Sequence, residues 1–205
     1  MYSQKNEEEI ILRYFGSRIG TFLDIGANDG KTLSNTYQLA LNGWSGACIE
    51  PSKIAFNKMQ ELYGSANENI ELFNYALSDE SGTFEFFESG NHLGNDDHSL
   101  LSTLVESEMD RWQGTRNRFT KTIVDAKTFR EFLNETKFAK FNVISIDIEG
   151  KDYDVLTQID LSKIGCEMLI VETNGKENDK FINYVSNFGL KLIHKNFENL
   201  IFARP

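Results

Sequence analysis

Carboxylate side chains stand at or beside the ends of four short apolar segments: Asp24, Glu50, Asp147 and Glu172. Each segment has the length of a buried strand, and residues at helical spacing follow it, which is typical of a parallel sheet covered by helices on both faces. Ligands of such sheets bind beyond the carboxyl ends of the strands, so we expect the four acids to share one crevice. Acids this close repel each other unless a cation or hydrogen-bond donors lie among them. Helix capping is the alternative, and it explains any one acid better than all four together.

The first apolar segment runs into the loop Gly26-Ala27-Asn28-Asp29-Gly30. A dinucleotide-binding loop carries a further glycine in its middle, which lets the backbone approach a pyrophosphate. Here Asn28 holds that position. Asparagine can adopt the left-handed conformation of glycine, but its side chain fills the space. The loop therefore predicts a nucleoside ligand without linked phosphates, although many such turns are only structural.

Glu50 supports the same hypothesis. It stands twenty positions after Gly30, at the end of the second strand, where an acid can accept both hydroxyls of a ribose. Pro51 disfavours a helical conformation of the residue before it, which keeps Glu50 extended. A solvated acid at a helix start is the alternative. A ligand with ribose and adenine, without phosphate and with positive charge near carboxylates, fits S-adenosylmethionine (SAM). Transfer of its methyl group needs chiefly positioning, plus a base when the acceptor is a hydroxyl.

Asp147 and Glu149 are the candidate catalytic residues. They stand two positions apart and so point to the same side of an extended chain. We expect Asp147 near the methyl-transfer centre, and Glu149 as a base or as a clamp for the acceptor. With Glu172 and Asp152 nearby, a divalent cation such as Mg²⁺ is conceivable, with Asp147, Glu149 and Glu172 as its ligands. We expect no metal, because Glu149 and Asp152 are also placed to cap the helix that starts near Lys151.

Residues 88–121 interrupt the alternation of strands and helices. This polar stretch is too long for an ordinary connection, and we expect it to cross the carboxyl edge of the sheet as a lid over the acceptor. His98 within it is a candidate general base, because histidine titrates near neutral pH, while a solvated acidic loop is the alternative. The stretch also carries a basic cluster with interleaved aromatic residues, which either binds anionic or sugar groups or belongs to a solvated amphipathic helix. The cluster comprises Arg111, Trp112, Arg116, Arg118, Phe119 and Lys121.

Hydrophobic periodicity predicts the elements that position these residues. Strands are expected at 21–25, 47–50, 70–76, 143–147 and 168–172, and helices around 10–15, 33–41, 55–62, 127–134, 155–159 and 181–188. Residues 83–87 alternate like an edge strand. A final hairpin over 190–194 and 200–203 adds an antiparallel edge. The chain, residues 1–205, is thus predicted to be one α/β domain.

Composition narrows the classes of function. The chain has 205 residues, a net charge of −10 and 40% hydrophobic residues. The acidic charge argues against nucleic acid as the main partner, because a broad positive field is missing. No run of eighteen apolar residues predicts a membrane span, and the first residues do not resemble a secretory signal. Cys48 and Cys166 are too few for a disulfide scaffold, so we expect reduced thiols and a cytoplasmic location.

Four ordered segments resemble the motifs of FkbM-type SAM-dependent methyltransferases: residues 22–30, 49–51, 74–79 and 147–152, the last followed by Val155 and Leu156. The similarity runs from about residue 20 to about residue 175. The segments Asn74-Tyr75-Ala76-Leu77-Ser78-Asp79 and Asp147-Ile148-Glu149-Gly150 make it specific. The resemblance implies a Rossmann-like class I methyltransferase fold, with a mostly parallel seven-stranded sheet and an antiparallel C-terminal hairpin. It also implies O-methylation of a hydroxyl of a sugar or a related small metabolite.

The resemblance further implies which residues hold SAM. Asp24, Gly26, Asn28 and Gly30 would hold the methionine part, Glu50 would hold the ribose, and residues 74–77 would flank the adenine. The cofactor-binding residues expected are Asp24, Gly26, Ala27, Asn28, Gly30, Glu50, Pro51, Asn74, Ala76, Leu77 and Asp147. Two other hypotheses stay open: an enzyme using a nucleotide cofactor, such as a dehydrogenase or epimerase, which Asn28 disfavours, and a SAM-binding module without catalysis.

Overall fold

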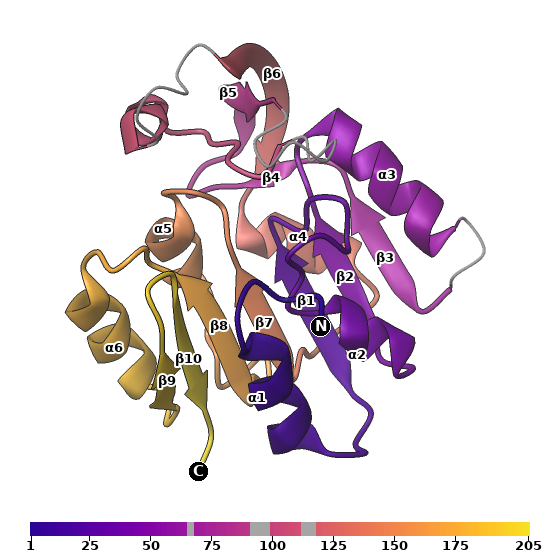
Figure 1. Cartoon of the computed structure of the whole chain (residues 1–205), viewed down its shortest axis with the longest axis vertical. Coiled ribbons are helices and arrows are strands. Elements are labelled where there is room, and N and C mark those ends of the chain that lie inside the picture. Colours follow the sequence, from indigo (N-terminus) through magenta and orange to yellow (C-terminus); the bar gives the residue numbers. More distant parts are fainter. Residues whose placement is uncertain (65–67, 91–98, 112–117) are drawn as a thin grey trace.

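Seven strands form the central sheet of the computed structural model, which describes residues 1–64, 68–90, 99–111 and 118–205. Their order is β3-β2-β1-β7-β8-β10-β9 (Figure 1). Five strands are parallel: β1 (Thr21–Ile25), β2 (Ser45–Ile49), β3 (Ile70–Phe73), β7 (Val143–Ile146) and β8 (Met168–Glu172). The terminal hairpin, β9 (Lys191–Lys195) and β10 (Asn199–Ala203), adds two strands, with β10 antiparallel to both β8 and β9. This confirms the predicted mostly parallel seven-stranded sheet with an antiparallel C-terminal hairpin.

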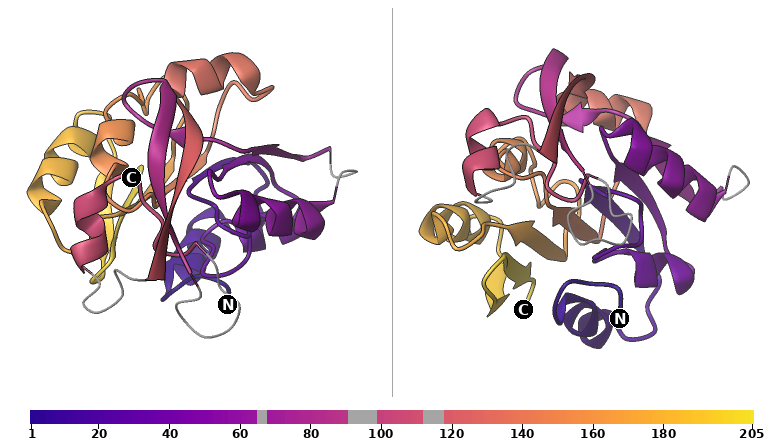
Figure 2. Two further views of the ribbon diagram at one scale, coloured as in Figure 1. Left: turned by 90° about the horizontal axis from the view of Figure 1, so that it is seen from above. Right: turned by 45° about the horizontal axis from the view of Figure 1, so that its top comes forward.

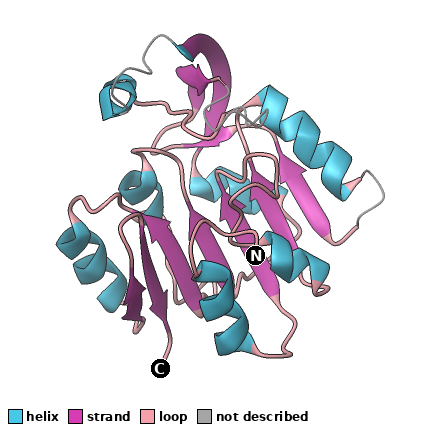
Figure 3. Ribbon diagram, viewed as in Figure 1, coloured by secondary structure: helices cyan, strands magenta, loops and turns pink. Residues whose placement is uncertain are grey.

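Helices cover both faces of this sheet (Figure 3). Residues of α1 (Glu7–Phe15), α2 (Tyr37–Leu41) and α3 (Lys53–Tyr63) belong to one buried cluster. Residues of α4 (Phe129–Glu135), α5 (Asp152–Leu156) and α6 (Asn178–Ser186) belong to the other. The helices arise because apolar residues at helical spacing must be buried against a sheet.

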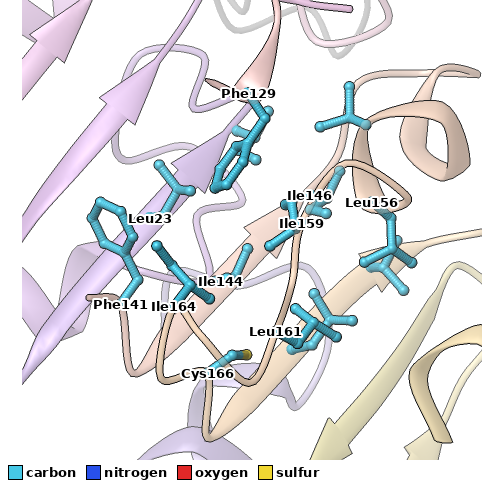
Figure 4. Close-up of a cluster of buried hydrophobic side chains, with 14 of the residues drawn as sticks. Leu23, Phe129, Phe141, Ile144, Ile146, Leu156, Ile159, Leu161, Ile164 and Cys166 are labelled. Carbon is cyan, nitrogen blue, oxygen red and sulfur yellow. The ribbon is translucent and has the colours of Figure 1, made fainter. Parts of the chain in front are cut away.

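Successive residues of a strand enter opposite clusters. In β1, Phe22 packs with the α1–α3 side and Leu23 with the α4–α6 side. In β7, Val143 and Ile144 divide in the same way. Figure 4 shows Leu23 and Ile144 on the α4–α6 side, together with Phe129 of α4. Both faces of the central strands are thus buried, which explains their nearly continuous apolar sequences.

A separate three-stranded sheet, in the order β4-β6-β5, replaces part of the predicted long loop. It consists of β4 (Ala76–Leu77), β5 (Gly82–Ser89) and β6 (Phe119–Lys127). The β5–β6 hairpin pairs from Gly82 with Ala126 to Ser89 with Phe119. In Figure 1 it lies at the top, beyond the carboxyl ends of the parallel strands, and the view from above shows it crossing the middle of the molecule (Figure 2, left). The predicted edge strand at 83–87 is therefore confirmed within β5.

Two predicted boundaries are wrong in this region. The strand expected at 70–76 ends at Phe73, and Ala76–Leu77 pairs with β6 instead of β2. The stretch 88–121 is not one loop, because its first two residues belong to β5 and its last three to β6. Polar residues on the exposed positions of β6 hid its alternation. Between the strands, a short 3₁₀ helix, η1, spans Glu106–Arg111.

Two predicted helices begin later than expected. Lys127 ends β6, and α4 begins at Phe129 because the side chain of Thr128 caps it in a reciprocal pair with Glu131. The helix predicted over 33–41 spans only Tyr37–Leu41, since Leu33 has a φ of +56° and lies in the preceding loop. Among the described residues, no helix combines the length and hydrophobicity needed to cross a bilayer.

Candidate active site

A cavity of about 370 Å³ opens at the carboxyl ends of the parallel strands. Its wall comes mainly from the loops that follow β1, β2, β7 and β8, from β4, from residues 99–102 and 104 of the β5–β6 connection, and from the β9–β10 turn. The volume lies within the range of small-molecule sites. Its position is the one that parallel sheets offer to ligands.

Most of the residues predicted to bind the cofactor line this cavity: Asp24, Gly26, Ala27, Asn28, Glu50, Pro51, Ala76, Leu77 and Asp147. Glu149 and Glu172, predicted as a catalytic residue and a possible metal ligand, line it as well. Gly30 and Asn74 are not part of the lining. His98, the candidate base, lies outside the described residues.

Gly30 and Asn74 instead support the loops around the cavity. At Gly30, where φ is +79°, a Cβ atom would lie 2.8 Å from the Tyr63 ring and 3.0 Å from Met59 Cγ, so glycine permits close packing on α3. Asn74 Nδ2 donates to the backbone oxygens of Glu50 (2.8 Å) and Pro51 (3.1 Å). Both residues thus act on the cavity through the backbone of neighbouring segments.

Gly26 joins three strand ends. Its N–H and that of Ala27 donate to the Ile49 carbonyl at 3.0 and 3.1 Å. At its φ of +85°, a Cβ atom would lie 1.8 Å from the backbone oxygen of Asp147. Only a residue without a side chain allows this approach, so Gly26 sets how closely the ends of β1 and β7 meet.

Glu50 is held by two backbone N–H groups. Its Oε2 accepts from Asn28 N at 2.9 Å, and its Oε1 accepts from Ser52 N at 2.7 Å. Asn28 has a φ of +50°, the left-handed conformation expected from the sequence. The Glu50 residue is 4% exposed, and burial raises its pKa to about 8, although the two N–H groups oppose the shift. Each carboxylate oxygen keeps a lone pair, so this fixed acid can accept two hydroxyls of a ligand.

Asp24 is the second buried acid of the cavity. Its Oδ2 accepts a hydrogen bond from Thr36 Oγ1 at 2.6 Å. Burial raises the pKa of Asp24 to about 6, and the hydroxyls of Thr36 and Ser34 oppose this shift. A cationic group of a ligand in the cavity would favour the ionised form of Asp24, because opposite charges at short range lower a carboxyl pKa.

Asp147, Glu149 and Glu172 form an acidic cluster whose carboxylate oxygens lie within 4.8 Å of one another. Asp147 is exposed at the cavity, whereas Glu149 and Glu172 are buried. Burial, and then repulsion within the cluster, raise the pKa values of Asp147 and Glu172 well above their usual range. Oxygen ligands in this arrangement fit a hard divalent cation. They can also share protons or pair with a cationic side chain.

A cationic side chain is present beside the acidic cluster. Arg111 of η1 donates through Nη2 to Glu149 Oε2, and its Nη1 lies 3.3 Å from Glu108 Oε2. Burial raises the pKa of Glu149 to about 7, with the Arg111 guanidinium opposing that shift. Thr103 Oγ1 donates to the Glu149 carbonyl at 2.7 Å. The β5–β6 connection is therefore attached to the end of β7 at two points.

The capping alternative is wrong for both Glu149 and Asp152, because the N-cap of α5 is Lys151 and no side chain of the described residues caps this helix. Asp152 accepts from the N–H groups of Ile148 and Gly150, each at 3.0 Å, and so stabilises the turn before α5. Glu149, with a φ of +54°, directs its carboxylate to Arg111 instead.

Of the predicted basic cluster, Arg111 alone among its described members is paired with a cavity-lining acid. Lys121 pairs with Glu85 on the hairpin at 2.7 Å, away from the cavity. Trp112 and Arg116 lie outside the described residues.

A family model described as the methyltransferase FkbM domain matches residues 24–192. The chain belongs to the FkbM methyltransferase family. This membership confirms the resemblance seen in the sequence and makes the chain a SAM-dependent methyltransferase. Family membership argues against the alternative hypothesis that the chain is a dehydrogenase or an epimerase. No curated protein matches the chain by sequence.

Solved structures show the same fold at low sequence identity. A putative RNA methyltransferase from Pyrococcus horikoshii is 12% identical, with a TM-score of 0.50 over 97% of this chain and 83% of that one. A precorrin-6y C5,15-methyltransferase from Geobacter metallireducens is 10% identical, with a TM-score of 0.52 over 98% and 89%. The METTL16 methyltransferase domain is 13% identical, with a TM-score of 0.52 over 96% and 64%. These similarities establish the class I methyltransferase fold of the FkbM-family chain.

Several cavity residues were not named individually from the sequence, among them residues 32–35 of the loop after β1. Residues 99–102 and 104 contribute apolar and hydroxyl side chains, including Leu101 and Ser102, and the β9–β10 turn contributes Phe197 and Glu198. The length of the stretch 88–121 indicated a position near the acceptor but not which of its residues line the cavity, and the turn has the sequence of an ordinary hairpin. Only the arrangement of strands brings them to the FkbM-family motifs.

Proposed function

We propose that this FkbM-family chain transfers the methyl group of SAM to a hydroxyl of a sugar or a related small metabolite. The observation that carries the proposal is the carboxylate of Glu50, held by the backbone N–H groups of Asn28 and Ser52 beside the cavity. A carboxylate in this position accepts the two hydroxyls of a ribose. SAM supplies the methyl group on a sulfonium that is a good leaving group.

Different cavity-lining residues would bind different parts of SAM. Glu50 and Pro51 would hold the ribose, and Ala76 and Leu77 would flank the adenine. Asp24, Gly26, Ala27 and Asn28 would hold the methionine part, where a carboxylate favours the ammonium group. Gly30 and Asn74 support these contacts through the packing described above. Catalysis then depends largely on holding the two substrates in line.

Asp147 and Glu149 would serve the acceptor end. Asp147, accessible from the cavity, orients the hydroxyl toward the methyl carbon. As the new carbon–oxygen bond forms and the carbon–sulfur bond breaks, the hydroxyl proton passes to the carboxylate of Glu149. The Arg111 guanidinium favours the charged form of Glu149, so a metal is not required in this proposal. The β5–β6 connection, which includes His98, would act as the lid over the acceptor.

The acceptor is proposed to be a small molecule because of charge. The net charge of −10 and the acids of the cavity disfavour a polyanionic nucleic acid. A carbohydrate offers neutral hydroxyls, which carboxylates bind well. Location in the cytoplasm, inferred from the cysteine content, is part of the same proposal.

Calorimetry with S-adenosylhomocysteine, the demethylated product, tests the cofactor assignment. We expect binding to the wild type, and a loss of about 1–3 kcal/mol in Glu50→Ala, because two ligand hydroxyls lose their acceptor. Glu85→Ala is the matched control, since Glu85 lies on β5 outside the cavity lining. No binding to the wild type at millimolar ligand would reject the proposal. Binding without methylation of any hydroxylated acceptor would favour a SAM-binding module without catalysis.

A further inference from the structure

We infer that the β9–β10 turn, residues 196–199, forms a subsite for the acceptor, with the Phe197 ring as a platform for a sugar ring and the Glu198 carboxylate as the partner of a sugar hydroxyl. The inference rests on the proposed function and identifies where its acceptor binds. Both residues line the cavity.

The turn is built rigidly. Asn196 Oδ1 accepts from the N–H groups of Glu198 (3.0 Å) and Asn199 (2.6 Å), and Asn196 N donates to the Asn199 carbonyl at 3.1 Å. Glu7 of α1, which is fully buried, accepts from Asn196 Nδ2 at 2.6 Å and from Asn199 Nδ2 at 3.0 Å. A turn fixed from within and from α1 holds the backbone of Phe197 and Glu198 in place without a ligand, which lowers the entropy lost on binding.

The turn is also attached to the end of β8. The Glu198 carbonyl accepts from Thr173 N at 2.7 Å and from Asn174 N at 3.0 Å. Asn199 is the register partner of Glu172, a member of the acidic cluster. Phe197 and Glu198 therefore stand beside the end of the cavity where methyl transfer is proposed.

Phe197 is an apolar ring that the fold leaves uncovered. It is 76% exposed, and among the described large hydrophobic residues only Met1 is more exposed. A single exposed apolar side chain is common on protein surfaces and proves nothing alone. Here the ring lines a cavity and sits on a rigid turn, so a ligand with an apolar face would bury it without any rearrangement.

Glu198 provides an independent indication of a ligand. Its Oε2 atom is buried and has no hydrogen-bond partner among the described residues. A buried carboxylate oxygen without a donor is unfavourable, and native structures contain few of them. If the Glu198 carboxylate turned toward the cavity, a hydroxyl of a ligand there would satisfy it. A pyranose ring combines the two features needed, namely hydroxyl donors at its edge and C–H groups on its face.

The order of strands separates this subsite from the ribose end of the cofactor. Glu50 follows β2, whereas the turn precedes β10, and β1, β7 and β8 lie between those two strands. A cofactor whose ribose lies at Glu50 and whose methyl group points to the β7 end leaves the β8–β10 end for the acceptor. The ammonium group of SAM is the alternative partner of the Glu198 carboxylate. Binding of S-adenosylhomocysteine to Glu198→Gln distinguishes it from a sugar hydroxyl.

Saturation-transfer NMR on the full chain tests the inference, with S-adenosylhomocysteine present and absent. The probes are the methyl α-pyranosides of glucose, galactose, mannose and rhamnose. We expect saturation of the glycoside ring protons with the wild type and with Phe197→Tyr. This saturation-transfer signal should fall about tenfold in Phe197→Ala and about fivefold in Glu198→Gln. Ile123→Ala, which removes a 65% exposed side chain from β6, and Glu177→Gln at the N-cap of α6 are matched controls that should bind like the wild type.

Three results would overturn the inference. The glycoside signal could persist unchanged in Phe197→Ala and Glu198→Gln. Glu198→Gln could weaken S-adenosylhomocysteine binding in calorimetry, which would assign the carboxylate to the cofactor. The wild type could bind the cofactor product but none of the glycosides. Failure of the wild type to bind S-adenosylhomocysteine is a separate result that rejects the proposed function, while the glycoside signal measured without that ligand still reports on the turn.

Discussion

Arg111 and Glu149, 38 residues apart in the chain, form an ion pair in which only 18% and 7% of the two side chains remain exposed. This pair joins the connection of the β5–β6 hairpin to the end of β7, where the acidic cluster lies. It also supplies the positive charge that the cluster needs, because the described acids crowd there at distances under 4.8 Å.

Replacement of Arg111 by methionine is expected to destabilise the protein by about 2–4 kcal/mol, because Glu149 is left buried without its partner. Urea unfolding measures the effect. The double variant Arg111→Met/Glu149→Gln should recover part of the loss, since Glu149 no longer carries an unpaired charge, while Glu108 keeps, among the described residues, only its pair with Lys176. Arg13→Met is the control: it breaks an exposed pair with Glu9 on α1, and such pairs contribute about 0–1 kcal/mol. Equal losses in Arg13→Met and Arg111→Met would contradict the proposed importance of the buried pair.

Stability of the ligand-free protein should fall as the pH rises through the titration of Glu50. Burial raises the pKa of Glu50 from 4.5 to about 8, so the folded state holds its proton more tightly than the unfolded state does. The contribution is fully present below pH 4.5 and is lost as the pH approaches 8. Glu50→Gln, which cannot ionise, should therefore gain up to about 4 kcal/mol relative to the wild type between pH 5 and pH 9.

Urea unfolding of the wild type and of Glu50→Gln at several pH values measures this difference. Glu85→Gln, at an exposed position on β5, should follow the wild type. If the curves of Glu50→Gln and the wild type run parallel over this range, Glu50 does not titrate as its burial predicts.

Gly26→Ala should destabilise the protein by at least about 3 kcal/mol, because overpacking adds to an unfavourable left-handed backbone. Its Cβ would lie 1.8 Å from the Asp147 oxygen, and β1 and β7 would have to separate. Gly43→Ala separates the two causes: Gly43 has a φ of +87° but nothing within 4 Å of a Cβ, so it should lose only about 1–2 kcal/mol. Thermal unfolding measures both. Similar losses of stability in Gly26→Ala and Gly43→Ala would show that the backbone at Asp147 moves away from the added Cβ atom at little cost.

Divalent cations should neither stabilise the protein nor change its affinity for S-adenosylhomocysteine. The Arg111 guanidinium occupies the Glu149 carboxylate, so a cation would have to displace it. Calorimetry in EDTA and in millimolar Mg²⁺ or Mn²⁺ measures the effect. Stabilisation by Mn²⁺ that disappears in Glu172→Gln but persists in Glu177→Gln would instead establish a metal site at Asp147, Glu149 and Glu172.

The sequence by itself determined the parallel strands, the final hairpin and the acids at the strand ends. These features are local, because burial on both faces requires continuous apolar segments, and a strand end is marked by the polar residue that follows it. Glu50 could be predicted to lie at the sheet edge because Pro51 restricts its conformation. The left-handed conformation of Asn28 could be expected for the same kind of reason, since few residue types tolerate it.

Tertiary structure decided which of these residues meet. The pairing of β4 with β6, the ion pair of Arg111 with Glu149, and the position of Phe197 beside the cavity all join segments far apart in the chain. Gly30, predicted to bind the cofactor, also packs closely on Tyr63 of α3, a contact that only the structure shows. Contacts of this kind depend on how elements pack in three dimensions, and hydrophobic periodicity and turn-forming residues carry no information about them.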